Sequence, residues 1–174
     1  MSQKLTCEIP EKLKGIAIVS ATMTKSLYQS CKTKHPLDVM IMFGDKETVF
    51  LDNGNLVSPI NQKHVRTQHI GITNTLSYWQ TRNHCNKPLV TGVLNKFNNK
   101  WGRYKDDGTT VVISDYQNCN KRVRFYDIKG GGHRWPDEKA SNGFMIRKVL
   151  NIGNASHEIS VAEEVIDFFH LIRR

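Results

Sequence analysis

Two apolar runs decide the fold: VMIMF at residues 39–43 and GIAIV at residues 15–19. Both runs are apolar throughout, without the alternation of a half-exposed strand. Strands of this kind are typical of parallel sheets that are covered by helices on both faces. Gly44 closes the first run and provides a turn signal. The sequence therefore predicts an α/β fold with a mostly parallel sheet.

Three segments outward from these runs are expected to be helical. Residues 2–8 predict a helix that stops ahead of Pro10, and residues 72–82 predict a second one. The best-defined helix begins at Ser160, which forms a capping-box pattern with Glu163. An apolar stripe at helical spacing follows and predicts packing on a sheet: Val161, Val165, Phe168, Phe169 and Ile172.

Residues 109–113 and 123–128 predict two more strands, either as a hairpin or as a pair within one sheet. Residues 85–108 are rich in Asn, Lys and Gly and predict an excursion from the sheet. With 174 residues, the chain has the length of one domain or part of one, so we treat residues 1–174 as a single unit.

Composition narrows the classes of partner. The net charge of +9 favours polyanions, but the basic clusters at 32–34 and 121–122 are short and no nucleic-acid motif accompanies them. We expect no specific nucleic-acid binding. No apolar run reaches the roughly 20 residues of a membrane span, and the charged stretch 1–15 does not resemble a signal peptide.

The cysteines are widely spaced, at positions 7, 31, 85 and 119, so no closely spaced ligand pair indicates a metal site. Four cysteines permit two disulfides in three pairings, and four buried thiols are equally compatible with the count. The glycines of residues 130–132 do not form a phosphate-binding motif, and we expect no cofactor.

Three residues are candidates for chemistry. His133 follows a predicted strand inside a glycine-rich loop, although the glycines could simply make a tight turn. Asp45 and Glu47 follow the run at 39–43, at the strand end where ligands bind in open α/β sheets. A carboxylate there can orient a histidine, but acidic residues are also common in any turn.

Together these segments resemble the poly(3-hydroxybutyrate) depolymerase and feruloyl esterase family. Residues 131–136 (GGHRWP), followed by a helix ending in two phenylalanines, are similar to its catalytic-histidine region. Residues 40–47 (MIMFGDKE) are similar to its acid loop, with Glu47 standing where the family has Asp. Residues 1–10 resemble the helix that follows the family's GxSxGG nucleophile elbow.

The resemblance implies the C-terminal part of an α/β-hydrolase, a three-layer sandwich whose serine nucleophile lies before Met1. It implies His133 as the catalytic base, Glu47 as the acid with Asp45 as the fallback, and Trp135 as a wall of the acyl pocket. None of the serines considered stands in a GxSxG elbow: Ser2, Ser20, Ser26 and Ser114.

It further implies an ester substrate, either a polyhydroxyalkanoate or a feruloyl or acetyl ester of polysaccharide. Disulfides Cys85–Cys119 and Cys7–Cys31 are implied, with an extracellular or periplasmic location. The chain is then one half of a split esterase, or of an esterase whose start was placed too late at Met1, and it needs its N-terminal portion for activity. Two alternatives remain: a decayed, inactive remnant, and a basic non-catalytic module that binds a polyanion or polymer surface.

Overall fold

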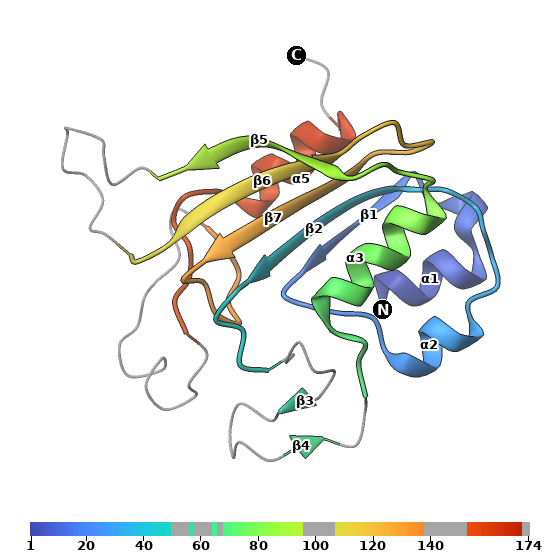
Figure 1. The fold of residues 1–174 in the computed structure, drawn as a ribbon, viewed down its shortest axis with the longest axis horizontal. Helices are drawn as coiled ribbons and strands as arrows, with labels where there is room; N and C mark the ends of the chain where they lie inside the picture. Colours follow the sequence, from blue (N-terminus) through green and yellow to red (C-terminus); the bar gives the residue numbers. More distant parts are fainter. Residues whose placement is uncertain (50–55, 58–63, 66–67, 96–106, 138–152, 172–174) are drawn as a thin grey trace.

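The computed structural model describes residues 1–49, 56–57, 64–65, 68–95, 107–137 and 153–171. Its centre is a five-stranded sheet (Figure 1). In spatial order the strands are β1 (Gly15–Val19), β2 (Asp38–Gly44), β7 (Val123–Lys129), β6 (Thr110–Tyr116) and β5 (Pro88–Leu94). The expected α/β class is confirmed.

The sheet is parallel in one half and antiparallel in the other. β1, β2 and β7 pair in parallel, whereas β7, β6 and β5 pair antiparallel. The prediction of a mostly parallel sheet is therefore wrong for the second half. The cause is local: β6 and β7 are joined by a short polar connection, which permits only antiparallel neighbours.

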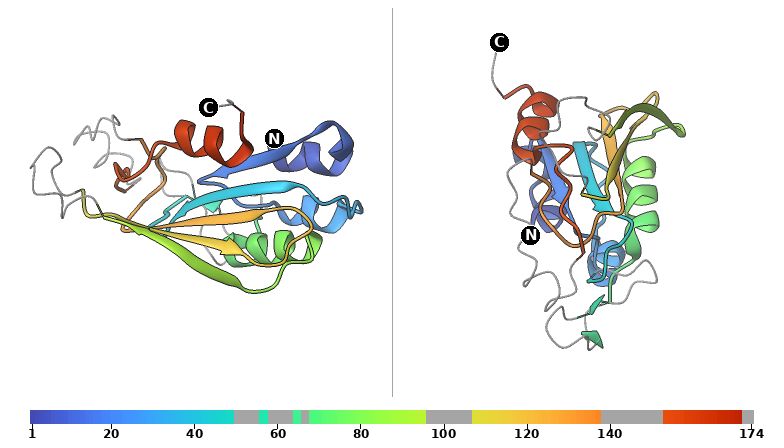
Figure 2. Two further views of the ribbon diagram at one scale, coloured as in Figure 1. Left: turned by 90° about the horizontal axis from the view of Figure 1, so that it is seen from above. Right: turned by 90° about the vertical axis from the view of Figure 1, so that its left-hand side faces the viewer.

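Helices cover both faces of the parallel half, as the apolar runs predict. Alternate residues of β2 enter two separate cores, because successive side chains of a strand point to opposite faces. Met40 and Met42 pack toward α5 (Val161–Phe169), and Val39 and Ile41 pack toward α3 (Gly71–Arg82). Figure 2 shows these two helices on opposite sides of the sheet.

The helix predictions are confirmed at α1 (Ser2–Glu8), α3 and α5. Ser160 is the N-cap of α5, but its side chain makes no capping hydrogen bond, so the expected capping box is not formed. The buried Tyr126 hydroxyl instead holds α5 to the sheet by donating to Glu164, and burial raises the pKa of Tyr126. Ile172 lies outside the described residues.

Several short elements were not expected. They are a single 3₁₀ turn (Pro10–Lys12), α2 (Lys25–Ser30), and an antiparallel pair of β3 (Leu56–Val57) with β4 (His64–Val65). The N-cap of α2 is Thr24, whose hydroxyl accepts a hydrogen bond from the backbone N–H of Leu27 at 3.2 Å.

Both disulfides implied by the resemblance are present. Cys7–Cys31 ties α1 to the end of α2, and Cys85–Cys119 ties the segment after α3 to the β6–β7 connection. In the part of the chain that the structure describes, no helix is long and apolar enough to span a membrane.

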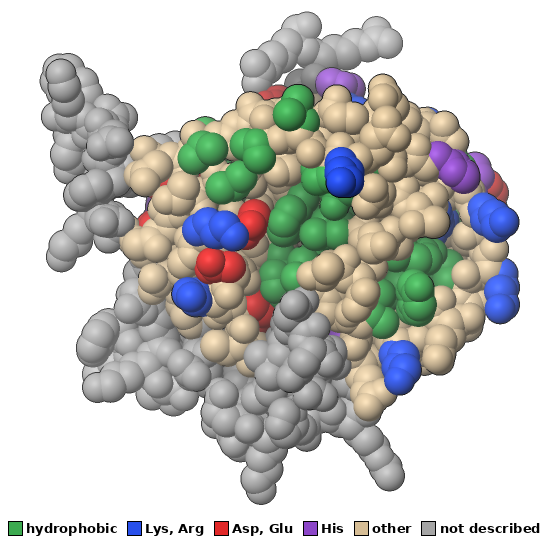
Figure 3. All heavy atoms as spheres, viewed as in Figure 1, with side chains coloured by type: hydrophobic (Ala, Val, Ile, Leu, Met, Phe, Trp, Pro, Cys, Tyr) green, Lys and Arg blue, Asp and Glu red, His purple; other side chains and the backbone are tan. Residues whose placement is uncertain are grey.

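β5 forms the outer edge of the antiparallel half of the sheet, and none of the described helices covers its apolar side chains. Leu89, Val90 and Val93 are each more than half exposed. Figure 3 shows hydrophobic side chains at the surface over this strand. β5 lies within residues 85–108, where the sequence predicted an excursion from the sheet, so this prediction is wrong for Pro88–Leu94.

Candidate functional site

The candidate site forms where two loops leave neighbouring parallel strands. The register pairs Gly44 at the end of β2 with Ile128 near the end of β7, so both loops begin at the same end of the sheet. The backbone N–H of Lys46 donates to the carbonyl of Gly131 at 2.8 Å. This contact joins the loop that carries Glu47 to the loop that carries His133.

Glycines make the contact between the loops possible. A β-carbon on Gly44 would lie 2.2 Å from the carbonyl oxygen of Gly131, far inside van der Waals contact. Gly130 has φ +75°, a left-handed conformation that side chains other than glycine's rarely adopt. The loop of residues 130–132 therefore shapes the site and is more than a simple turn.

His133 and Glu47 are in direct contact. Nδ1 of His133 lies 2.8 Å from Oε2 of Glu47. Because a carboxylate can only accept, Nδ1 of His133 carries a proton and donates it to Glu47. The Glu47 side chain is 3% exposed and that of His133 31%, so the acid is shielded while the imidazole can be reached.

The second carboxylate oxygen of Glu47 also has a hydrogen-bond partner. The backbone N–H of Val49 donates to Oε1 of Glu47 at 2.7 Å. A carboxylate held at both oxygens presents one orientation to the imidazole and can stabilise its protonated form.

Asp45, the fallback acid, has a different partner. Its Oδ1 accepts the backbone N–H of Gly130 at 2.7 Å. The glycine loop is held from its other side as well, because the N–H of Gly132 donates to the carbonyl of Asn154 at 2.9 Å. Asp45 thus secures the backbone of the loop that presents His133, and Glu47 is the acid in contact with the ring.

Sequence reasoning missed the part that Ser20 plays beside this loop. Ser20 directly follows β1 in a left-handed conformation (φ 46°), and its hydroxyl donates to the carbonyl of Arg134 at 3.4 Å. A polar residue directly after a buried apolar run was the available signal. Ser26 and Ser114 lie in α2 and β6, and Ser2 lies in α1.

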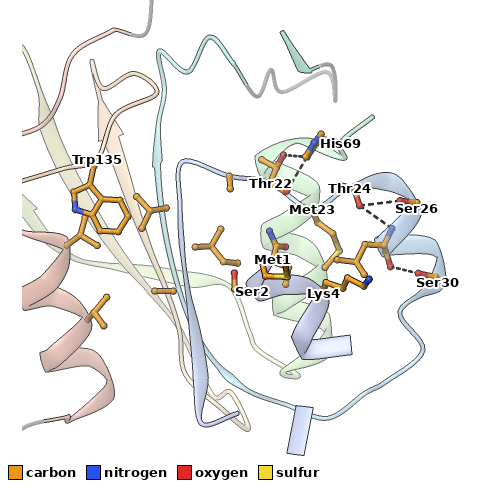
Figure 4. A pocket seen from close by; sticks show the side chains of 18 of the residues that line it. Met1, Ser2, Lys4, Thr22, Met23, Thr24, Ser26, Ser30, His69 and Trp135 are labelled. Carbon is orange, nitrogen blue, oxygen red and sulfur yellow. Dashed lines mark hydrogen bonds between the residues drawn. The ribbon is translucent and has the colours of Figure 1, made fainter. Parts of the chain in front are cut away.

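Trp135 stands at the rim of a hollow of about 1040 Å³, which we call the β1 hollow (Figure 4). Trp135 is 59% exposed. The other walls of the β1 hollow come from α1, β1, α2 and the start of α5. His69 also lines it; burial lowers the pKa of His69, and a hydrogen bond with the Thr22 backbone opposes that shift only in part.

Within the described residues, no group of three or more His, Cys, Asp or Glu side chains is placed to hold a metal ion. No model of a known protein family matches the sequence, and a search of curated proteins found no match.

Proposed function

We propose that this chain is the C-terminal part of a carboxylic ester hydrolase, related to poly(3-hydroxybutyrate) depolymerases and feruloyl or acetylxylan esterases. The observation that carries the proposal is the contact between His133 and Glu47. Helices on both faces of the sheet support a three-layer α/β-hydrolase arrangement. Glu47 and His133 each follow a strand, and the acid precedes the histidine in the chain, as in that fold.

The two residues suit the proton transfers of acyl transfer. In such a reaction a serine hydroxyl attacks the ester carbonyl, and Nε2 of His133 takes the hydroxyl proton and later delivers it to the leaving alcohol. Glu47 stabilises the imidazolium that exists between these steps. The serine and the oxyanion-binding N–H groups come from a separate N-terminal portion.

The surroundings fit an ester with an apolar acyl part. Trp135, which is exposed two residues after His133, offers an apolar surface for such a group, either from a polyhydroxyalkanoate or from a feruloyl or acetyl ester of polysaccharide. The two disulfides support an oxidising compartment, extracellular or periplasmic.

The test is complementation. The chain is mixed with the front portion of a poly(3-hydroxybutyrate) depolymerase, ending after the helix that follows its GxSxGG elbow, and hydrolysis of p-nitrophenyl butyrate is measured. We expect no turnover by the chain alone and turnover by the mixture. His133→Ala and Glu47→Ala should abolish it, whereas His35→Ala, in an exposed loop, should preserve it.

Three results would overturn the proposal. The first is a stable mixture without ester hydrolysis, which would favour the decayed remnant. The second is hydrolysis that survives His133→Ala. Hydrolysis by the chain alone that is lost in Ser20→Ala would instead place the nucleophile within this chain.

A further inference from the structure

β1 is the terminal strand on its side of the described sheet, and its outer edge has no partner strand there. The N–H of Ser20 donates to the carbonyl of Met42, which fixes which residues of β1 bond inward to β2. In a parallel pair, alternate residues bond to the same neighbour. Ala17 and Val19 therefore direct their backbone N–H and C=O groups to the open edge.

This edge runs along the β1 hollow. Ala17, Ile18 and Val19 line the hollow between two sets of apolar side chains. Met23 and Leu27 lie on one side, and Val161 and Val165 of α5 lie on the other. Figure 4 shows the ribbon of β1 passing between α5 with Trp135 on one side and α1 on the other.

The backbone N–H and C=O groups of an edge strand are a template for pairing with another strand. A ligand that fills the apolar space and also bonds to the backbone of Ala17 and Val19 uses both features of the hollow.

We propose that the β1 hollow receives an extended apolar strand from a partner polypeptide, which adds to the sheet beside β1. Strand addition supplies N–H and C=O groups at the spacing of β1. The occupant is about as long as the five residues of β1. Its side chains are apolar on both faces, because one face meets α5 and the other meets Met23 and Leu27.

Other occupants fit less well. An acyl chain fills apolar space but leaves the amides of Ala17 and Val19 without partners. A second copy of this chain would bring its own α1, α2 and α5, which flank its β1 in the same way, into the space that these walls occupy. A single strand enters between the walls.

The proposal does not depend on ester hydrolysis, because it rests on the edge of β1 and on the hollow alone. Peptide binding and hydrogen exchange therefore test the added strand, whereas the complementation assay with His133 variants tests ester hydrolysis. A negative result in one assay leaves the other proposal standing.

The probe is a synthetic peptide with five alternating valine and isoleucine residues, matched to the length of β1, and glutamates at both ends to complement the net charge of +9. We expect it to slow amide hydrogen exchange at Ala17 and Val19 at least tenfold. The control peptide has the same side chains but N-methylated backbone amides, and should give no protection.

Variants locate the contact. Val19→Glu places a charge in the β1 hollow and should abolish binding, whereas Val90→Glu on β5, at the other edge of the sheet, should not. If Val19→Glu fails to fold, Ala17→Pro is used in its place. It removes an N–H group that points to the open edge, and it should weaken peptide binding. Three results overturn the proposal: no protection, equal binding of the N-methylated peptide, or a free chain that sediments as a dimer with Ala17 and Val19 already protected.

Discussion

The backbone of Gly44 meets the backbone of Gly131 so closely that no side chain fits between them, because a β-carbon on Gly44 would lie 2.2 Å from the Gly131 carbonyl oxygen. Gly131 is constrained in turn, since its own β-carbon would lie 2.5 Å from Cγ2 of Ile128. Each glycine allows the loops of Glu47 and His133 to lie together.

Gly44→Ala is therefore expected to separate the two loops. We expect a loss of about 2–3 kcal/mol in the free energy of unfolding, as for overpacked cores, together with loss of the His133–Glu47 contact. Urea denaturation measures the first and imidazole NMR the second. Gly92→Ala is the matched control, because its β-carbon would meet only Ile113 at 3.4 Å. Equal stability of the two variants would contradict the prediction.

Asn83 holds together three segments from a fully buried position. Its amide nitrogen donates to the carbonyls of Leu37 and Lys121, and its oxygen accepts the N–H of Leu37. Asn83→Ala leaves these buried groups without partners, and we expect a loss of about 3 kcal/mol in unfolding free energy. Asn86→Ala, at an exposed position, should change it by less than about 0.5 kcal/mol. A small effect at Asn83 would mean that water replaces the amide.

The disulfide Cys85–Cys119 encloses a sequence separation of 34 residues. Replacing both cysteines by alanine is expected to lower the free energy of unfolding by about 2–4 kcal/mol. Thermal denaturation of the wild type and the double variant, each with and without dithiothreitol, measures this loss. A double variant as stable as the oxidised wild type would show that the bridge constrains little.

Asp115 should make the protein sensitive to acid. Burial raises the pKa of its carboxyl group, but hydrogen bonds from Arg124 and Thr91 outweigh burial, so the pKa in the folded protein is below its usual value. A lowered carboxyl pKa stabilises the fold above the unfolded pKa of about 3.9, and this contribution disappears as the pH falls through the folded pKa.

Asp115→Asn is therefore expected to be less stable than the wild type at pH 7, with a shallower loss of stability below about pH 4. Urea denaturation at a series of pH values gives both slopes. Glu11→Gln, at an exposed position, serves as the control and should keep the wild-type slope. Parallel curves for Asp115→Asn and the wild type would exclude this role.

Local sequence signals predicted much of the fold. The runs at 15–19 and 39–43 identify β1 and β2 because burial on both faces leaves an unbroken apolar pattern. His133 and Glu47 were placed beside each other on chain order and resemblance, and the structure brings them into contact. Their catalytic roles stay a prediction.

Other features depend on tertiary contacts that no local pattern encodes. β5 carries exposed apolar residues and a register shift between Val90 and Gly92, so its periodicity is broken. Ser160 offers a capping-box pattern, yet α5 is fixed through Glu164, whose partner lies 38 residues earlier in the chain. Asp45 and Glu47 are two residues apart, and only the packing of the glycine loop shows which one meets His133.

The division of the sheet into two halves also has a consequence for the order of folding. β5, β6 and β7 pair with neighbours in sequence, whereas β2 and β7 pair across a separation of 84 residues. Contacts between sequence neighbours form early, and the closure of long loops comes late. His133 and Glu47, 86 residues apart, can meet only after β7 has docked on β2. We therefore expect the candidate site to be absent from any partly folded chain and to appear in the last step of folding.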